Sequence, residues 1–561
     1  MTQTPKVTVN EKPRTLLSHE RRAQLAADLE LGCGNFLHAA VRINPEADAP
    51  LFFMDEPART VAGRSYASFS LNSLREAVDA TAAWYFGAGI REKDLVAVYV
   101  GEGVENLIHY LALNAIGAIP SLINGNMRPE YAAGFVRKIG AIALFTDREH
   151  EANIVSHLAA HDLRFVATVE SAAEFPNPRL PGVYPYHHVE LDPVLVGHSS
   201  GTTGIPKAVV FLHQQFFHGI RYRLGLPHPE GADRLLSALP HSHSAGIAYV
   251  MLATLAGTPV RILSSNRAPH VLAQIEAFQP SMVVAFPETF VGLTEEDFGN
   301  YDLSSLRIWM NGGDAAHETH IRKLVAVGHR LREERRIPGS VFIDGLGSSE
   351  MGFSLFRMIH TPETASYDRC IGQPLEWVDA AILDENGAKL PPHRIGRLGV
   401  RAPSVTHGYW NDSVLSARSR IQGYWLTGDL FYRDEQNRFF HVDRTPDAIP
   451  TDAGVLYSLQ TEELLMKHDP TIIDCTVIGV PGKAEAPVAL GLVRMSESIT
   501  EPETALRARF NTILAAQGKP GLAAVRRVKA NEIPLGPTGK VLKAELRAKY
   551  RAEPLASAEF A

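Results

Sequence analysis

Apolar residues along the chain gather in short unbroken runs that are separated by longer stretches of helical periodicity. Residues 95–100 (LVAVYV) form one such run. A strand of a parallel sheet is buried on both faces, so its sequence is almost continuously apolar. Similar short runs occur at residues 142–145, 165–169, 282–286, 306–310 and 341–343. Their spacing predicts βαβ units and a mainly parallel sheet, with a capping box from Ser73 to Glu76 opening an early helix.

The pattern changes after Cys370, where turn sequences interrupt shorter alternating runs. The turns are GQP at 372–374, DENG at 384–387 and GYW at 408–410, and they indicate hairpins. We therefore expect an α/β fold: a large N-terminal domain of parallel βαβ sheets with an antiparallel β subdomain, and a small mobile α+β C-terminal domain. The turn at 445–447 (TPD) sets the predicted boundary. The large domain would span 1–445, with about 1–25 as a loose arm, and the small one 446–561.

Composition and charge narrow the functional class. Of 561 residues, 45% are hydrophobic and 21% charged, as in ordinary globular proteins. Lys and Arg number 55 against 62 Asp and Glu, a net charge of −7, which argues against nucleic acid as a partner. Three widely spaced cysteines predict no disulfide framework and favour a cytoplasmic protein. The most apolar helical candidate, 245–257, falls short of the roughly 20 residues of a membrane span and is predicted to be a core helix.

The most informative stretch is residues 197–207, GHSSGTTGIPK. Its glycines allow the backbone to approach a phosphate, its hydroxyls donate hydrogen bonds, and Lys207 adds a positive charge. The spacing excludes an ordinary Walker loop, because two residues separate Gly204 from Lys207 and alanine follows the lysine. A plain Ser/Gly surface loop is the alternative. The predicted phosphate ligands are Ser199, Ser200, Gly201, Thr202, Thr203, Gly204 and Lys207.

This loop resembles the phosphate-binding signature of the AMP-forming adenylating enzymes, which include acyl-CoA and aryl-CoA synthetases, peptide-synthetase adenylation domains and luciferase. Five further segments resemble family motifs in the family's order: PHSHSAG at 240–246, NGGDA at 311–315, GSSE at 347–350, GYWLTGD at 423–429 and PTGK at 537–540. Arg444 stands at the arginine position of the domain junction. The resemblance spans roughly residues 60–545.

The resemblance implies a role for each matching residue. Lys207, Lys540 and His243 are the predicted catalytic residues, with Lys540 bridging the substrate carboxylate and the α-phosphate of ATP and His243 in the wall of the acyl pocket. Glu350 and Thr203 would position Mg²⁺. The nucleotide would further contact Gly313, Asp314, Ser349, Asp429 and Arg444, with Asp429 on the ribose hydroxyls.

The leading functional prediction is activation of a small carboxylic acid as acyl-adenylate, with transfer to CoA or to the phosphopantetheine thiol of an acyl carrier protein. An amine, or another nitrogen or oxygen nucleophile, is the alternative acceptor. It is motivated by Pro446 at the hinge, where proline fixes φ, and by a weak match near the thiol tunnel at 454–458. Leu346 also replaces the tyrosine that stacks on adenine. A nucleotide-binding module without catalysis is a third possibility.

Two smaller expectations concern the pocket and the histidines. Tyr249, Phe286 and Phe290 are candidates for an apolar pocket, although core packing explains such residues equally well. The i, i+2 spacing of His241 and His243 argues against the two histidines as a pair of metal ligands. His187 and His188 are predicted to lie in a surface loop.

Overall fold

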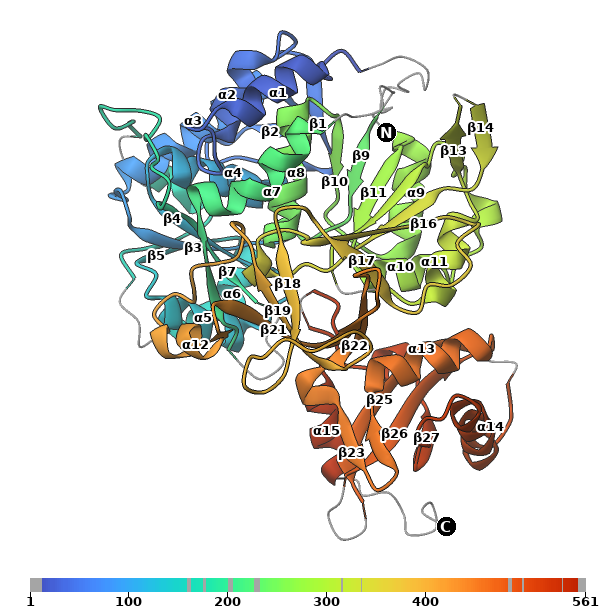
Figure 1. Cartoon of the computed structure of the whole chain (residues 1–561). Coiled ribbons are helices and arrows are strands. Elements are labelled where there is room, and N and C mark those ends of the chain that lie inside the picture. The colour runs from blue at the N-terminus through green and yellow to red at the C-terminus, as the bar shows by residue number, and fades with distance from the viewer. Residues whose placement is uncertain are drawn as a thin grey trace.

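The computed structural model describes residues 13–158, 163–174, 178–199, 205–226, 233–313, 316–333, 335–482, 487–496, 499–536 and 538–552. Its largest body contains three sheets and most of the helices, and the C-terminal elements from β23 onward form a smaller body beside it (Figure 1). No helix among these residues is long and apolar enough to span a bilayer.

Most of the strands belong to one 14-stranded sheet, counted over the described residues. In sheet order its main path is β18 (Asp379–Leu383), β19 (Gly396–Arg401), β21 (Tyr424–Arg433), β22 (Phe439–Arg444), β17 (Cys370–Pro374), β16 (Phe356–His360), β15 (Val341–Asp344), β12 (Ile308–Asn311), β11 (Met282–Ala285), β9 (Leu235–Ser237), β10 (Val260–Ile262), β1 (Pro50–Arg59) and β2 (Ser65–Ser70). The short β20 (Arg420–Ile421) pairs with β21.

The strands from β1 to β15 along this path pair in parallel. The apolar runs predicted β11, β12 and β15 among them, whereas β1, β9 and β10 were not predicted. From β15 to β18 the pairing is antiparallel. The predicted α/β class with parallel and antiparallel parts is therefore confirmed. The antiparallel part is not a separate sheet, because β16 pairs with β15 and joins it to the parallel strands.

Two further sheets complete the large body. One is parallel and contains β4 (Ile119–Ile123), β3 (Leu95–Tyr99), β5 (Ala143–Thr146) and β6 (Val166–Ala167). The other is the antiparallel pair β7 (Pro193–His198) and β8 (Ala208–Leu212). A small hairpin, β13 (His329–Arg332) with β14 (Arg335–Pro338), lies apart from them.

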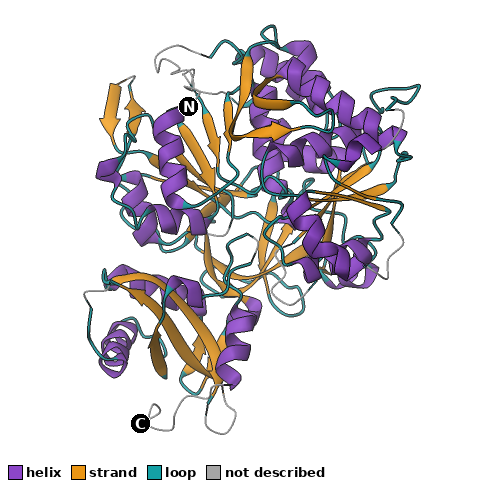
Figure 2. Ribbon diagram, turned by 180° about the vertical axis from the view of Figure 1, so that it is seen from behind, coloured by secondary structure: helices purple, strands orange, loops and turns teal. Residues whose placement is uncertain are grey.

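Helices pack around these sheets (Figure 2). They are α1 (His19–Ala27), α2 (Phe36–Ile43), α3 (Leu71–Gly87), α4 (Val104–Ala115), α5 (Pro129–Ile139), α6 (Arg148–Leu158), α7 (His213–Gly225), α8 (Ser244–Ala256), α9 (Ala268–Phe278), α10 (Pro287–Leu293), α11 (Glu318–Val325) and α12 (Ser413–Arg418). The predicted apolar helix is α8, most of whose residues are buried in the main core.

Two local expectations at the N-terminus need correction. The loose arm predicted for about 1–25 is wrong from Thr15 onward, because Thr15 and Leu17 are buried and α1 packs on α7. Residues 1–12 lie outside the described part of the chain. The capping box is also shifted: Ser70 is the N-cap of α3, and Ser73 is the third helical residue that bonds back to it.

The elements after Arg444 form the smaller body. β25 (Ile472–Pro481) and β26 (Pro487–Met495) pair antiparallel, and β27 (Ala524–Arg527) pairs in parallel with β26. The hairpin β23 (Ile449–Thr451) with β24 (Gly454–Leu456) and the helices α13 (Ser458–His468), α14 (Glu503–Ala516) and α15 (Lys543–Ala552) complete it. The Glu463 carboxylate on α13 lies 2.6 Å from the His317 ring at the start of α11, so polar contacts join the smaller body to the large one.

Candidate functional site

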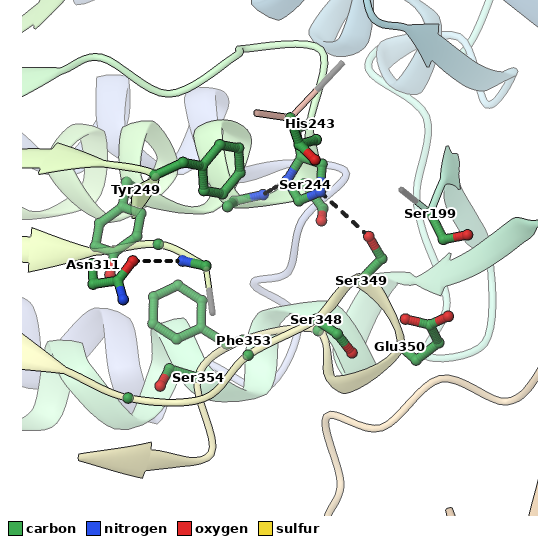
Figure 3. A pocket seen from close by; sticks show the side chains of 18 of the residues that line it. Ser199, His243, Ser244, Tyr249, Asn311, Ser348, Ser349, Glu350, Phe353 and Ser354 are labelled. Carbon is green, nitrogen blue, oxygen red and sulfur yellow. Dashed lines mark hydrogen bonds between the residues drawn. The ribbon is translucent and has the colours of Figure 1, made fainter. Parts of the chain in front are cut away.

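The main cavity lies at the carboxyl ends of four adjacent parallel strands, β9, β11, β12 and β15. The connections that leave these strands carry His243, Phe286, Gly313 and Glu350 respectively. Because parallel strands present all their carboxyl ends at one edge, segments that are far apart in sequence converge there. The cavity measures about 80 Å³. Figure 3 shows the side chains that surround it.

His243 forms one wall of this cavity as the N-cap of α8. Its Nδ1 accepts a hydrogen bond of 3.1 Å from the Ala245 amide. Burial, with smaller contributions from the nearby His198 and Lys540, lowers the pKa of His243 to about 3. The ring is therefore neutral with its hydrogen on Nε2, which lies 3.5 Å from Ser349 Oγ (Figure 3). His243 can donate a hydrogen bond into the cavity, but it is not a base at neutral pH.

A glycine turn after β12 forms the neighbouring part of the wall. The Asn311 amide oxygen accepts a bond of 3.0 Å from the Gly313 amide (Figure 3), and the Asn311 side-chain nitrogen donates to Asp344 at 2.8 Å. Burial raises the pKa of Asp344 to about 6. A side chain at Gly313 would come within 3.1 Å of Phe286, so glycine allows the close approach of this turn.

Glu350 and Lys207 are joined through a third residue, Tyr409. The Tyr409 hydroxyl donates to Glu350 Oε1 at 3.0 Å and accepts from Lys207 Nζ at 3.5 Å. Burial and the Glu350 charge raise the pKa of Tyr409, so the phenol keeps its proton. The hydroxyl thus fixes one carboxylate oxygen beside the cavity. A single carboxylate that shares a cation with phosphate oxygens is a typical Mg²⁺ site, so Glu350 fits the predicted ion.

A second cavity of about 480 Å³ adjoins the first and lies between the two bodies. The two cavities share Phe286, Gly313, Thr538 and Lys540. Several cationic side chains line the larger one: Arg369, Arg444, Arg494, Lys543 and Arg547. Its volume is in the range of ordinary small-molecule pockets. Three of these cations form ion pairs with acidic residues that line the same cavity, Arg494 with Glu295, Lys543 with Glu462 and Arg547 with Asp447.

Asp429 and Arg444 lie opposite each other on β21 and β22. Arg444 Nε is 2.8 Å from Asp429 Oδ1, and the buried His441 ring is 3.9 Å from the same oxygen. Arg444 lines the larger cavity, and Asp429 is buried next to it. The pair is held by the register of β21 and β22, and Arg444 borders the same cavity as Lys540.

Most of the predicted site residues that the structure describes converge. Those lining the main cavity are Ser199, His243, Gly313, Ser349, Glu350 and Lys540. Lys207 reaches this group through Tyr409, and Arg444 with Asp429 borders the second cavity. The predicted residues Ser200, Gly201, Thr202, Thr203, Gly204 and Asp314 lie outside the described residues.

The sequence analysis missed Tyr409, Thr538 and Phe353. Thr538 lines both cavities and precedes Lys540 by two residues, so the TGK motif itself was a signal. The only sequence feature noted near Tyr409 was the predicted hairpin turn at 408–410, and no sequence motif pointed to Phe353. Tyr249 and Phe286 line the main cavity as proposed, whereas Phe290 is buried in a core cluster and borders only the second cavity.

The surface location expected for His188 is wrong. His188 is buried, its Nε2 is 3.0 Å from the Asn114 carbonyl oxygen, and its ring stacks on His213 at 4.9 Å. The three cysteines are buried and free. Burial raises the pKa of each thiol.

Comparison with known proteins identifies the class. Residues 46–410 match the family model of the AMP-binding enzymes, and the chain belongs to this family. It is therefore an adenylate-forming enzyme. It is 41% identical to a 3-aminoavenalumate diazotase from a Streptomyces species, over 96% of this chain and 99% of the relative. It is 27% identical to 4-coumarate–CoA ligase 2 from Oryza sativa subsp. japonica, over 83% of this chain and 84% of the relative.

The solved structures show the same fold. The anthranilate CoA ligase AuaEII, solved in complex with anthranoyl-AMP, superposes with a TM-score of 0.79 at 19% identity, over 96% of this chain and 99% of that one. This likeness confirms the predicted fold of the adenylating enzymes.

Proposed function

We propose that this enzyme is an ATP-dependent diazotase that uses the amino group of a small aromatic amine as the acceptor. The observation that carries the proposal is the 41% identity to 3-aminoavenalumate diazotase over nearly the whole of both chains. The nitrogen acceptor that was the alternative in the sequence analysis thus becomes the first choice. The CoA thiol is the second candidate, supported by the 27% identity to 4-coumarate–CoA ligase.

Diazotisation requires a donor of the second nitrogen, and nitrite is the oxoanion with the correct oxidation state. In the proposed first step a nitrite oxygen attacks the α-phosphorus of ATP, and the bond to pyrophosphate breaks. In the second step the amine attacks the nitrosyl nitrogen, the N–O bond to AMP breaks, and the amine loses a proton. The N-nitroso product tautomerises, takes up a proton and loses water to give the diazonium ion. The sum consumes amine, nitrite and ATP and yields diazonium, AMP, pyrophosphate and water.

The main cavity supports a small activated oxoanion. Its volume of about 80 Å³ accommodates nitrite, and the adjoining cavity of about 480 Å³ has room for a larger molecule. Lys540 and the neutral His243 both line it and offer N–H donors to an oxoanion. In this proposal Lys540 neutralises charge at the α-phosphate, Lys207 and the 199–204 loop hold the outer phosphates, and Asp429 accepts from the ribose hydroxyls.

Mg²⁺, when bound, would neutralise phosphate charge beside Glu350. The protein itself orients that carboxylate through Tyr409. We also propose that residues 1–445 and 446–561 act as two domains, and that their interface, where Lys540 and Arg444 border one cavity, encloses the nucleotide.

Oxygen-18 labelling tests the activated group directly. Nitrite labelled with ¹⁸O is supplied with ATP, Mg²⁺ and an aromatic amine that also bears a carboxylate, and AMP is analysed by mass spectrometry. One ¹⁸O from nitrite should appear in AMP, and the diazonium ion should be trapped as an azo dye with a naphthol. If ¹⁸O enters AMP from a labelled carboxylate instead, and CoA then forms a thioester, the enzyme is an acid–thiol ligase and the proposal is wrong.

A further inference from the structure

A partly buried arginine without an anionic partner among the described residues contacts the wall of the main cavity. Arg223 is near the end of α7, and its guanidinium carbon is 4.0 Å from the centre of the Phe353 ring. Phe353 lines the main cavity together with Tyr249, and their ring centres are 5.4 Å apart. A side chain at Gly219, one turn earlier on α7, would come within 2.9 Å of Phe353, so glycine lets this ring sit against the helix.

No acidic side chain among the described residues neutralises the positive charge of Arg223. Among the described residues no Asp or Glu forms an ion pair with its guanidinium, whose one hydrogen bond, from Nη1, is a long contact of 3.4 Å to the Gly219 carbonyl oxygen. Desolvation and the positive charge of Arg357 lower the pKa of Arg223, the Tyr249 phenol raises it, and the net value of about 10 leaves the side chain a cation at neutral pH.

Arg221, two residues earlier on the same helix, shows what a structural arginine looks like in this fold. Its two terminal nitrogens donate to the carbonyl oxygens of Ala26, Asp28 and Leu31 and to the Gln214 side chain. These bonds tie α7 to the segment after α1. Arg223 makes no comparable set of bonds, so holding the fold together does not explain its position.

We propose that Arg223 binds a carboxylate of the aromatic amine substrate, at the end of the molecule remote from the reacting amino group. The inference rests on the proposed diazotase function, in which the amine rather than the carboxylate reacts. The substrate ring would lie against Tyr249 and the displaced Phe353, two aromatic side chains that suit a flat ring. Its carboxylate would replace the Phe353 ring as the partner of the Arg223 cation.

Phe353 controls access to Arg223 in this arrangement. Phe353 lines the main cavity and covers Arg223, so a substrate carboxylate can reach the guanidinium only if the Phe353 ring moves. Phe353 is the wall residue that contacts Arg223, and Gly352 before it has a φ of +73°, which glycine adopts without strain. Rotation of Phe353 would both enlarge the cavity and expose the guanidinium. Binding at Arg223 would also keep the substrate carboxylate away from Lys540, where the carboxylate would otherwise compete with nitrite for reaction with ATP.

The test compares acids with their neutral amides. Wild type, Arg223→Gln and Arg223→Lys are assayed for nitrite-dependent azo-dye formation with 3-aminobenzoate, 3-aminocinnamate and the primary amide of each. Loss of a charged hydrogen bond of about 1.5–3 kcal/mol predicts a fall of about 10- to 150-fold in kcat/KM for the better acid in Arg223→Gln. For the amide, kcat/KM should change less than about twofold in Arg223→Gln, because the amide forms no charged hydrogen bond with Arg223. Arg223→Lys should retain part of the preference for the acid. The exposed Arg418→Gln on α12 is the matched control for loss of one positive charge.

Equilibrium binding separates this inference from the proposed function. Acid and amide are titrated calorimetrically into each variant in the presence of a non-hydrolysable ATP analogue and without nitrite. If no diazonium forms but wild type binds the acid more tightly than the amide and Arg223→Gln does not, the diazotase proposal fails and the Arg223 assignment stands. Equal losses for acid and amide, or an unchanged preference in Arg223→Gln, would overturn the assignment. So would ¹⁸O transfer from the acid to AMP, because its carboxylate would then lie at Lys540.

Discussion

Replacing Tyr409 by phenylalanine removes a single hydroxyl from between Lys207 and Glu350. The ring can keep its place, since Tyr409 packs at 5.5 Å from Trp425 through its apolar face. The lost bond of 3.0 Å has a charged acceptor, and such bonds contribute about 1.5–3 kcal/mol. At about 1.4 kcal/mol for each tenfold change, the Kd for Mg·ATP should rise about 10- to 150-fold. The apparent affinity for Mg²⁺ should fall as well, because Glu350 loses the group that orients it.

The assay is pyrophosphate release at varied Mg²⁺ and fixed ATP, together with direct titration of Mg·ATP. Tyr424→Phe is the matched control, because the Tyr424 hydroxyl also bonds a carboxylate, that of Asp379 at 2.8 Å, away from both cavities. Thermal unfolding of the two variants shows whether either change acts only through stability. If both variants give the same Mg²⁺ and ATP dependence, Tyr409 has no role in the nucleotide site.

Three further changes test other parts of the site. Lys540→Ala should slow adenylate formation by about 10²- to 10³-fold with little change in thermal stability, since it removes one preorganised charge; near-normal ATP–pyrophosphate exchange would exclude Lys540 from the mechanism. Asp429→Ala should weaken ATP binding by about 1.5–3 kcal/mol and weaken 2′,3′-dideoxy-ATP less; equal losses in titration would contradict the ribose contact. Pro446→Lys should leave adenylate formation unchanged and speed its consumption only if the fixed φ of proline limits domain rotation; single-turnover rates of the two half-reactions decide this, and unchanged consumption would refute the restriction.

The parallel strands β3, β5, β6, β11, β12 and β15 could be located from the sequence alone. Helices or loops cover both faces of the strands at residues 95–100, 282–286 and 341–343, so each of these segments is apolar without interruption. Burial on both faces can therefore be recognised in the local sequence. The ends of elements were less certain. Ser70 and Ser73 are three residues apart, and either can cap a helix. The pairing of Ser70 with Pro50 across β1 and β2 decides where the strand stops and therefore where α3 begins.

The candidate site likewise contains residues that sequence motifs predicted and residues that only the structure revealed. Short motifs that resemble those of the adenylating enzymes predicted Lys207, Glu350, Asp429 and Lys540 as site residues, and the loop of glycines and hydroxyls before Lys207 also indicated phosphate binding by itself. Tyr409 escaped notice because its partners are 59 and 202 residues away in the chain. Hydrogen bonds between residues so far apart depend on which loops meet at the sheet edge, and no local pattern records that.

The partners of polar side chains depend most of all on the tertiary structure. His188 looked like a loop residue, yet it stacks on His213, which follows directly after β8. Arg221 and Arg223 are the same residue type on one helix, and only their neighbours in the fold make one a structural tie and leave the other without an anion. The sequence by itself determined the α/β fold, because the fold follows from local periodicity, and the resemblance of its ordered motifs to those of the adenylating enzymes identified the family and predicted the nucleotide-site residues. The tertiary structure decided which charges are paired, because pairing and burial are set by contacts between distant segments.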